Sequence, residues 1–229
     1  MRKKNKKYYF SVEGETEKWY FEWLQKTINL VPESLHTVKF DCQIQKDPLK
    51  RVKGLVVMEK TEITHIFDRE SEQVVHLKQF ETTLDRMKEA ENLGKSIKYS
   101  LGYSNFSFEL WIVLHKADCN SSLSHRRQYL PFINRAYSED FENLDEYKHE
   151  TNFKRILNKL TIGDAGLAVR RSKSIMQANH ANGYVLHQYK GYKYNTENPS
   201  LSIWEIVDKI LYESGLCVKK NLKLPDMGH

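Results

Sequence analysis

Residues 8–17 read YYFSVEGETE, an apolar run that stops at a Glu-Gly pair. Aromatic and β-branched residues over 7–12 predict a strand, and Gly14 permits a tight turn. After Thr16, apolar side chains recur at helical spacing, namely Trp19, Tyr20, Trp23, Leu24 and Ile28. The sequence therefore predicts a strand, a turn and a helix, with Glu13 and Glu17 on either side of the start of the helix.

The alternation of strand and helix patterns continues to about residue 101. Further strands are expected over 38–44, 64–67 and 96–101, and helices from Asp47-Pro48 to about residue 60 and over 74–92. Such repeated units are typical of a mainly parallel sheet with helices packed on its faces, so the fold class is α/β. The chemistry of such sheets lies at the carboxyl ends of the strands, where Glu13 and Asp68 fall.

After Asn105 the pattern becomes helical, and no further strand is predicted. The expected helices cover 106–115, 123–137, 152–160, 165–179 and 200–214. We therefore expect a core over 1–115 and a helical C-terminal extension over 116–229.

The composition is that of a globular protein rather than of a disordered or membrane protein. Of the 229 residues, 40% are hydrophobic and 29% are charged, and no apolar run approaches the roughly 18 residues of a membrane span. The basic N-terminal head lacks the pattern of a signal peptide, and the three widely spaced cysteines exclude a disulfide framework, so a cytoplasmic protein is expected. None of the ten glycines begins the phosphate-binding motif of P-loop ATPases.

Two acidic groups follow predicted strands. Glu13 and Glu17 bracket the first turn, and Asp68 and Glu70 stand two residues apart after the third strand. Carboxylates gathered at one sheet edge repel one another unless a cation lies among them, and hard oxygen ligands select Mg²⁺ or Mn²⁺. Each group also has a structural interpretation, because Glu17 suits a helix N-terminus and an Asp after a strand is often a cap.

These residues carry a resemblance. A strand that ends in a Glu-Gly turn, followed by an Asp-x-acidic pair, resembles the Toprim fold of topoisomerases, primases and OLD-type nucleases. More narrowly, residues 12–17 and 67–69, the segment SNFSFELW at 104–111 with His115, and Asn198-Pro199-Ser200 resemble the RloB-like family of bacterial phage-defence proteins. The resemblance spans most of the chain and implies a Toprim-like catalytic core at 1–115.

The resemblance implies metal-dependent cleavage of a phosphodiester, with Mg²⁺ or Mn²⁺ as cofactor. The implied metal ligands are Glu13, Glu17, Asp68 and Glu70. Glu109 and His115 complete the candidate catalytic set. Glu109 lies in an apolar helix, where it either faces a cation or a donor if it is buried, or occupies an exposed position of an amphipathic helix. His115 suits either proton transfer or a helix C-terminus.

Two residues depart from the family pattern. Glu70 stands where Asp is commoner, which lengthens a metal ligand by one methylene. Phe106 stands where Pro is expected, which concerns only the rigidity of the loop.

The basic excess of the chain lies in its last third, since residues 151–229 hold 12 Lys and Arg against 6 Asp and Glu. Arg170, Arg171 and Lys173 share a predicted helix. The loop after it interleaves Tyr189, Lys190, Tyr192 and Lys193, a pattern that suits stacking and phosphate contacts on single-stranded nucleic acid. A solvated face, or a loop that packs on the core or on a partner protein, fits the same residues.

The leading hypothesis is therefore a Mg²⁺-dependent nuclease of an anti-phage defence system, with DNA or RNA as substrate. The alternative is a non-catalytic nucleic-acid-binding or regulatory subunit of a defence complex. The resemblance implies a separately encoded ATPase as partner, and the sequence leaves the oligomeric state open.

Overall fold

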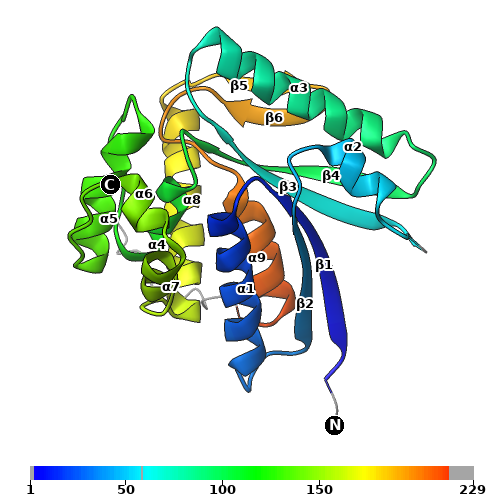
Figure 1. Ribbon diagram of the computed structural model, residues 1–229, viewed down its shortest axis with the longest axis horizontal. Helices are drawn as coiled ribbons and strands as arrows, with labels where there is room; N and C mark the ends of the chain where they lie inside the picture. The colour runs from blue at the N-terminus through cyan, green and yellow to red at the C-terminus, as the bar shows by residue number, and fades with distance from the viewer. Residues whose placement is uncertain (1–2, 58, 217–229) are drawn as a thin grey trace, which may run out of the picture.

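The computed structural model describes residues 3–57 and 59–216 and contains a central parallel sheet (Figure 1). Its strands follow the order β2-β1-β3-β4, and all neighbouring pairs are parallel. The strands are β1 (Asn5–Val12), β2 (Thr37–Ile44), β3 (Thr61–Arg69) and β4 (Ile97–Asn105). The α/β fold class and the parallel sheet predicted from the sequence are confirmed.

The helices that surround the sheet are α1 (Glu15–Leu30), α2 (Pro48–Lys53), α3 (Val74–Glu91), α4 (Glu109–Lys116), α5 (Leu130–Tyr137), α6 (Leu144–Lys148), α7 (Glu150–Leu157), α8 (Ile162–Ala181) and α9 (Ile203–Glu213). A short 3₁₀ turn, Arg126–Tyr129, precedes α5. Local sequence fixes several of these starts. Asp47 accepts a hydrogen bond from the backbone N–H of Leu49 at 3.0 Å, and Thr161 and Asp164 cap α8 reciprocally.

Three details of the sequence prediction are wrong. The second helix ends at Lys53 rather than near residue 60, because the chain leaves the helix at Gly54. Residues 144–148 form α6, which was not predicted. The segment expected to be a loop after α8 is an antiparallel hairpin of β5 (Leu186–Tyr189) and β6 (Tyr192–Asn195), whose turn uses positive φ at Lys190 and Gly191.

The alternation of side chains on β3 separates two hydrophobic layers. Ile66 points to the face that α1, α4, α8 and α9 cover, whereas Ile63 and Phe67 point to the face covered by α2, α3 and the β5–β6 hairpin. Figure 1 shows α3 and the hairpin together above the sheet. The hydrophobic layer that contains Ile66 includes residues of both β1 and the C-terminal helices. The predicted core (1–115) and the predicted extension (116–229) therefore share this layer.

The end of β4 is tied to a distant segment of the chain. Asn105 is buried, and its Nδ2 lies 3.2 Å from the carbonyl oxygen of Asn195 and 2.9 Å from that of Glu197. Its backbone N–H donates to the carbonyl of Ser200 at 3.0 Å. Arg69, also buried, donates to both oxygens of Glu72 and to the carbonyl of Thr196. These bonds hold residues 195–200 against the carboxyl edge of the sheet.

Within residues 3–57 and 59–216, no helix combines the length and the apolar character needed to cross a bilayer.

We expect Asn105→Ala to lower the free energy of unfolding by about 2 to 3 kcal/mol, because it leaves buried carbonyl groups without a donor. Chemical denaturation measures the change. Asn120→Ala is the matched control, since Asn120 is exposed, and its effect should stay within about 0.5 kcal/mol. An Asn105→Ala variant as stable as the control would contradict the structural role given to this amide.

Candidate functional site

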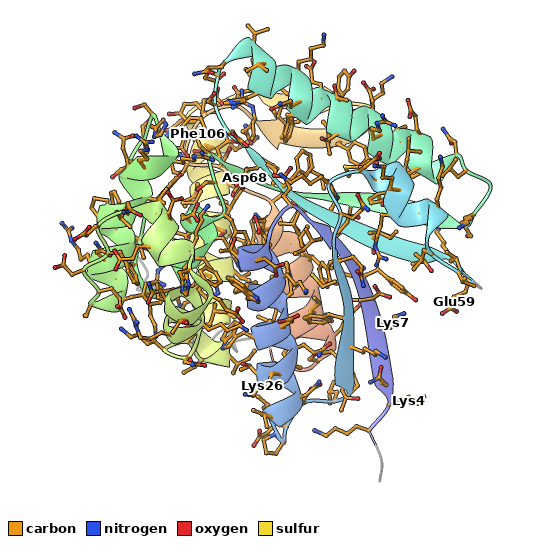
Figure 2. All side chains as sticks on the ribbon, in the orientation of Figure 1. Lys4, Lys7, Lys26, Glu59, Asp68 and Phe106 are labelled. Atoms are coloured by element: carbon orange, nitrogen blue, oxygen red, sulfur yellow. The ribbon has the colours of Figure 1, made fainter. Side chains whose placement is uncertain are left out.

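The carboxyl edge of the sheet gathers acidic side chains from four segments. Glu13 follows β1 directly, and Asp68 lies near the end of β3. Because β1 and β3 pair in parallel, with Val12 opposite Ile66, these two residues meet, and the Asp68 backbone N–H lies 3.4 Å from Glu13 Oε2. Glu17 in the first turn of α1 and Glu109 at the start of α4 complete the group, which we call the carboxylate cluster. Figure 2 shows Asp68 near the middle of the molecule.

Burial and mutual repulsion raise the pKa values of three members of the carboxylate cluster. Burial raises the pKa of Glu13 to about 7, and the charges of Glu17 and Glu70 add to this shift. Burial likewise raises the pKa of Glu17, with Glu109 as a further cause, and that of Asp68, with Glu17 and Glu13 as further causes. The three side chains therefore share one electrostatic environment that disfavours their full ionisation.

Lys148 supplies a positive charge within this environment. It lies at the end of α6, and its Nζ is 3.0 Å from Glu109 Oε1. Nearby carboxylates, Glu109 first among them, raise the pKa of Lys148 against the opposing effect of burial, which keeps it charged. Glu109 itself is fully buried and also accepts a hydrogen bond from Ser107. Lys148 belongs to the extension, so residues on both sides of position 116 form the cluster.

Lys148 was not predicted as a site residue from the sequence. It is the only basic residue in the short helix LDEYK, and nothing in its local pattern connects it with Glu109, 39 positions earlier in the chain. Only the tertiary fold brings the two together, with Lys148 Nζ 3.0 Å from Glu109 Oε1.

The donor set suits a hard divalent cation, because every donor is a carboxylate oxygen and one lysine does not balance the charge. The oxygens are not arranged as a finished ligand set. Among residues 3–57 and 59–216, no group of three or more His, Cys, Asp or Glu side chains lies close enough together to hold an ion. Binding of a cation by Glu13, Glu17 and Asp68 thus requires at least one of these side chains to reorient.

Glu70 lies at the edge of the carboxylate cluster, and His115 lies apart from it. Glu70 Oε2 is 3.6 Å from His76 Nε2, and Glu70 influences Glu13 but is not among the charges that chiefly affect Asp68. His115 is six residues beyond Glu109 on α4, about 9 Å along the helix axis. Its ring contacts the Trp111 carbonyl and the Tyr20 hydroxyl, and burial lowers its pKa to about 4. At neutral pH it is an uncharged core residue at the end of a helix.

The basic and aromatic residues of the last third are mostly engaged within the protein. Arg171 pairs with Asp118 and Lys173 with Asp208. Lys190 forms an ion pair with Asp85, and the Tyr189 hydroxyl donates a hydrogen bond to the same carboxylate. Tyr192 packs in the hydrophobic layer that α2, α3 and the hairpin cover. Arg170 and Lys193 are exposed. These contacts give most of the set structural roles, and its binding of nucleic acid stays a prediction.

Phe106, which stands where the family pattern has Pro, is buried behind the carboxyl edge and is labelled in Figure 2. Its peptide bond with Asn105 is cis, as is the Asn198–Pro199 bond.

The Glu109–Lys148 pair makes a testable contribution to stability. We expect Lys148→Met to lower the free energy of unfolding by about 1 to 3 kcal/mol, because it leaves the buried Glu109 carboxylate without its cation. The double variant with Glu109→Gln should recover most of the loss. Denaturant titration of the two single variants and the double variant measures the coupling, and additive effects would show that the pair is not energetically coupled.

The raised pKa of Glu13 also has a consequence for stability. The folded protein binds this proton more tightly than the unfolded chain, so the free energy of unfolding should fall as pH rises from about 5 to 8. Glu13→Gln should reduce this loss by about 1 to 2 kcal/mol, since the variant cannot ionise there. Melting curves of both proteins in metal-free buffer test the difference, and parallel pH profiles would refute it.

The sequence was compared with family models, curated proteins and solved structures. No curated protein and no solved structure matches the chain. A family model described as RloB-like protein matches residues 8–210, a range that includes most of β1, all members of the carboxylate cluster and most of α9. Since the match covers most of the sequence, the chain belongs to the RloB-like family.

Proposed function

We propose that this protein is a Mg²⁺-dependent nuclease with a Toprim-type site, acting in bacterial defence against phage. The observation that carries the proposal is the carboxylate cluster. Glu13, Glu17, Asp68 and Glu109 converge from four segments at the edge of a parallel sheet where active sites of such folds lie, and Lys148 offsets only part of their charge. A site built only to bind phosphate would gain nothing from concentrated negative charge.

The roles of the residues follow from their positions. Glu13, Glu17 and Asp68 would hold the cation, which would supply charge neutralisation at the phosphorus and a more acidic bound water. A carboxylate bound to a cation is ionised, so Glu13 in the loaded site would act as a ligand, and the proton of the attacking water would pass to solvent. Lys148 holds Glu109 and places a positive charge beside the developing negative charge of the phosphate.

Hydrolysis under this proposal forms one bond and breaks one. The water oxygen attacks phosphorus, its proton passes to solvent, and the bond from phosphorus to the leaving oxygen breaks. The leaving oxygen takes a proton from solvent. The family resemblance implies a separately encoded ATPase as partner, and under this proposal the two proteins act together in the cytoplasm.

One observation favours a second candidate, a non-catalytic subunit that binds nucleic acid. In the described part of the chain no three candidate ligands are grouped to hold an ion. The two functions differ in turnover, so a cleavage assay separates them.

We expect Asp68→Asn to abolish Mg²⁺-dependent cleavage, with a loss of at least about 100-fold in rate, while the melting temperature stays level or rises because repulsion within the cluster is relieved. The assay uses labelled DNA, tRNA and other RNA with Mg²⁺, with Mn²⁺ and with EDTA. Asp140→Asn, at an exposed carboxylate, is the matched control and should cleave at the wild-type rate.

Persistent cleavage by Asp68→Asn would place the active site elsewhere. Absence of cleavage by the wild-type protein on every substrate, with its partner ATPase present, would favour the non-catalytic subunit.

A further inference from the structure

A cleft opens beside the carboxylate cluster on the α3 side of the sheet. Its volume is about 610 Å³, and it runs between α3 and the turn that leads from β2 into α2. Glu13 and Glu70 line one end, so the cleft is continuous with the candidate active site. No aromatic side chain lines it among residues 3–57 and 59–216.

Three cations line this cleft. Lys46 comes from the turn before α2, and Lys78 and Arg86 come from α3. All three are exposed, and none forms an ion pair within residues 3–57 and 59–216. Arg171, Lys173 and Lys190, by contrast, are held by carboxylates of the same chain. The cleft therefore presents positive charges that the fold itself does not use.

The spacing of the α3 residues forms one continuous stripe. Lys78, Thr82 and Arg86 follow one another at four-residue intervals, which places them on the same face of the helix over about 12 Å. Successive phosphates of one strand rise about 3.4 Å along a B-form axis, so the stripe is long enough to meet more than one phosphate. Gln79 lies beside it as an additional polar donor.

We propose that this cleft binds the phosphodiester backbone of a nucleic-acid strand and guides it to the carboxylate cluster through Lys46, Lys78 and Arg86. The inference rests on the proposed function for its choice of ligand. Cations and amide groups contact phosphates, whereas the lining has no ring on which a base could stack, so recognition is of the backbone and largely independent of sequence.

Three carboxylates, those of Glu13, Asp47 and Glu70, also line the cleft. Within residues 3–57 and 59–216 none of them forms an ion pair with the three cations, since Asp47 accepts a hydrogen bond from the backbone N–H of Leu49 and Glu70 lies beside His76. Lys46 and Glu13 line the same cleft, and the charge of Lys46 opposes part of the rise in the pKa of Glu13. A phosphate held by Lys46 would thus sit next to the proposed site of attack.

The experiment compares wild-type protein with Lys46→Glu/Lys78→Glu/Arg86→Glu. Fluorescence anisotropy of a labelled 20-mer is measured in EDTA from 50 to 250 mM KCl, with single-stranded DNA and RNA of equal sequence as separate arms. We expect affinity at 150 mM salt to fall at least about tenfold, and the slope of log K against log salt to decrease by about 2 to 2.7.

Lys4→Glu/Lys26→Glu/Lys39→Glu is the matched control, since it removes the same charge from exposed lysines away from the cleft. Figure 2 shows Lys4 and Lys26 at the opposite end of the molecule from Asp68. This control should lose much less affinity than the cleft variant. A milder variant, Lys46→Gln/Lys78→Gln/Arg86→Gln, repeats the comparison if the reversed charges lower the melting temperature.

Three results would each overturn the inference. The wild-type protein and both cleft variants could bind with equal affinity, the cleft variant and the control could lose equal affinity, or the wild-type protein could bind neither nucleic acid. Because binding is measured without metal, these outcomes are independent of turnover. A protein that binds through the cleft but cleaves nothing retains the inference and loses the nuclease proposal.

Discussion

The parallel pairing of β1 with β3 is the constraint on which the site depends. It brings the ends of two strands to one edge, so that Glu13 and Asp68 meet although 55 positions separate them. Burial of this edge by α1, α4 and α6 then brings Glu17, Glu109 and Lys148 into the same low-dielectric region. Each additional carboxylate there raises the energy of ionising the others, and the charge of Lys148 partly offsets this repulsion.

Much of the fold could be predicted because it follows from local periodicity. The alternating pattern before residue 105 reproduces the four strands of the sheet, and the turn at Gly14 places α1 correctly. The β5–β6 hairpin was missed because Lys190, a residue with no special preference for positive φ, occupies its turn. The second helix was predicted to be too long because apolar residues continue the helical pattern after Gly54, whereas the helix of the structure ends at Lys53.

Part of the carboxylate cluster could be predicted because several of its residues follow the ends of predicted strands. Glu13, Glu17 and Asp68 are neighbours of strand ends, and topology alone brings such positions together. Lys148 and the isolated position of His115 depend on how helices pack at long range, which no local pattern records. The charge excess of residues 151–229 predicted a binding face there, yet the described contacts show that much of that charge forms internal ion pairs.

The hydrogen bonds between β4 and residues 195–200 cannot form until late in the synthesis of the chain. Asn105 finds its partners 90 to 95 positions later in the chain. At translation speeds of about 5 to 20 residues per second, roughly 5 to 19 s pass between the synthesis of the strand end and that of the segment that closes it. During this interval the ribosome-bound chain can pair its four parallel strands, while the carboxyl edge still lacks the backbone groups that complete it.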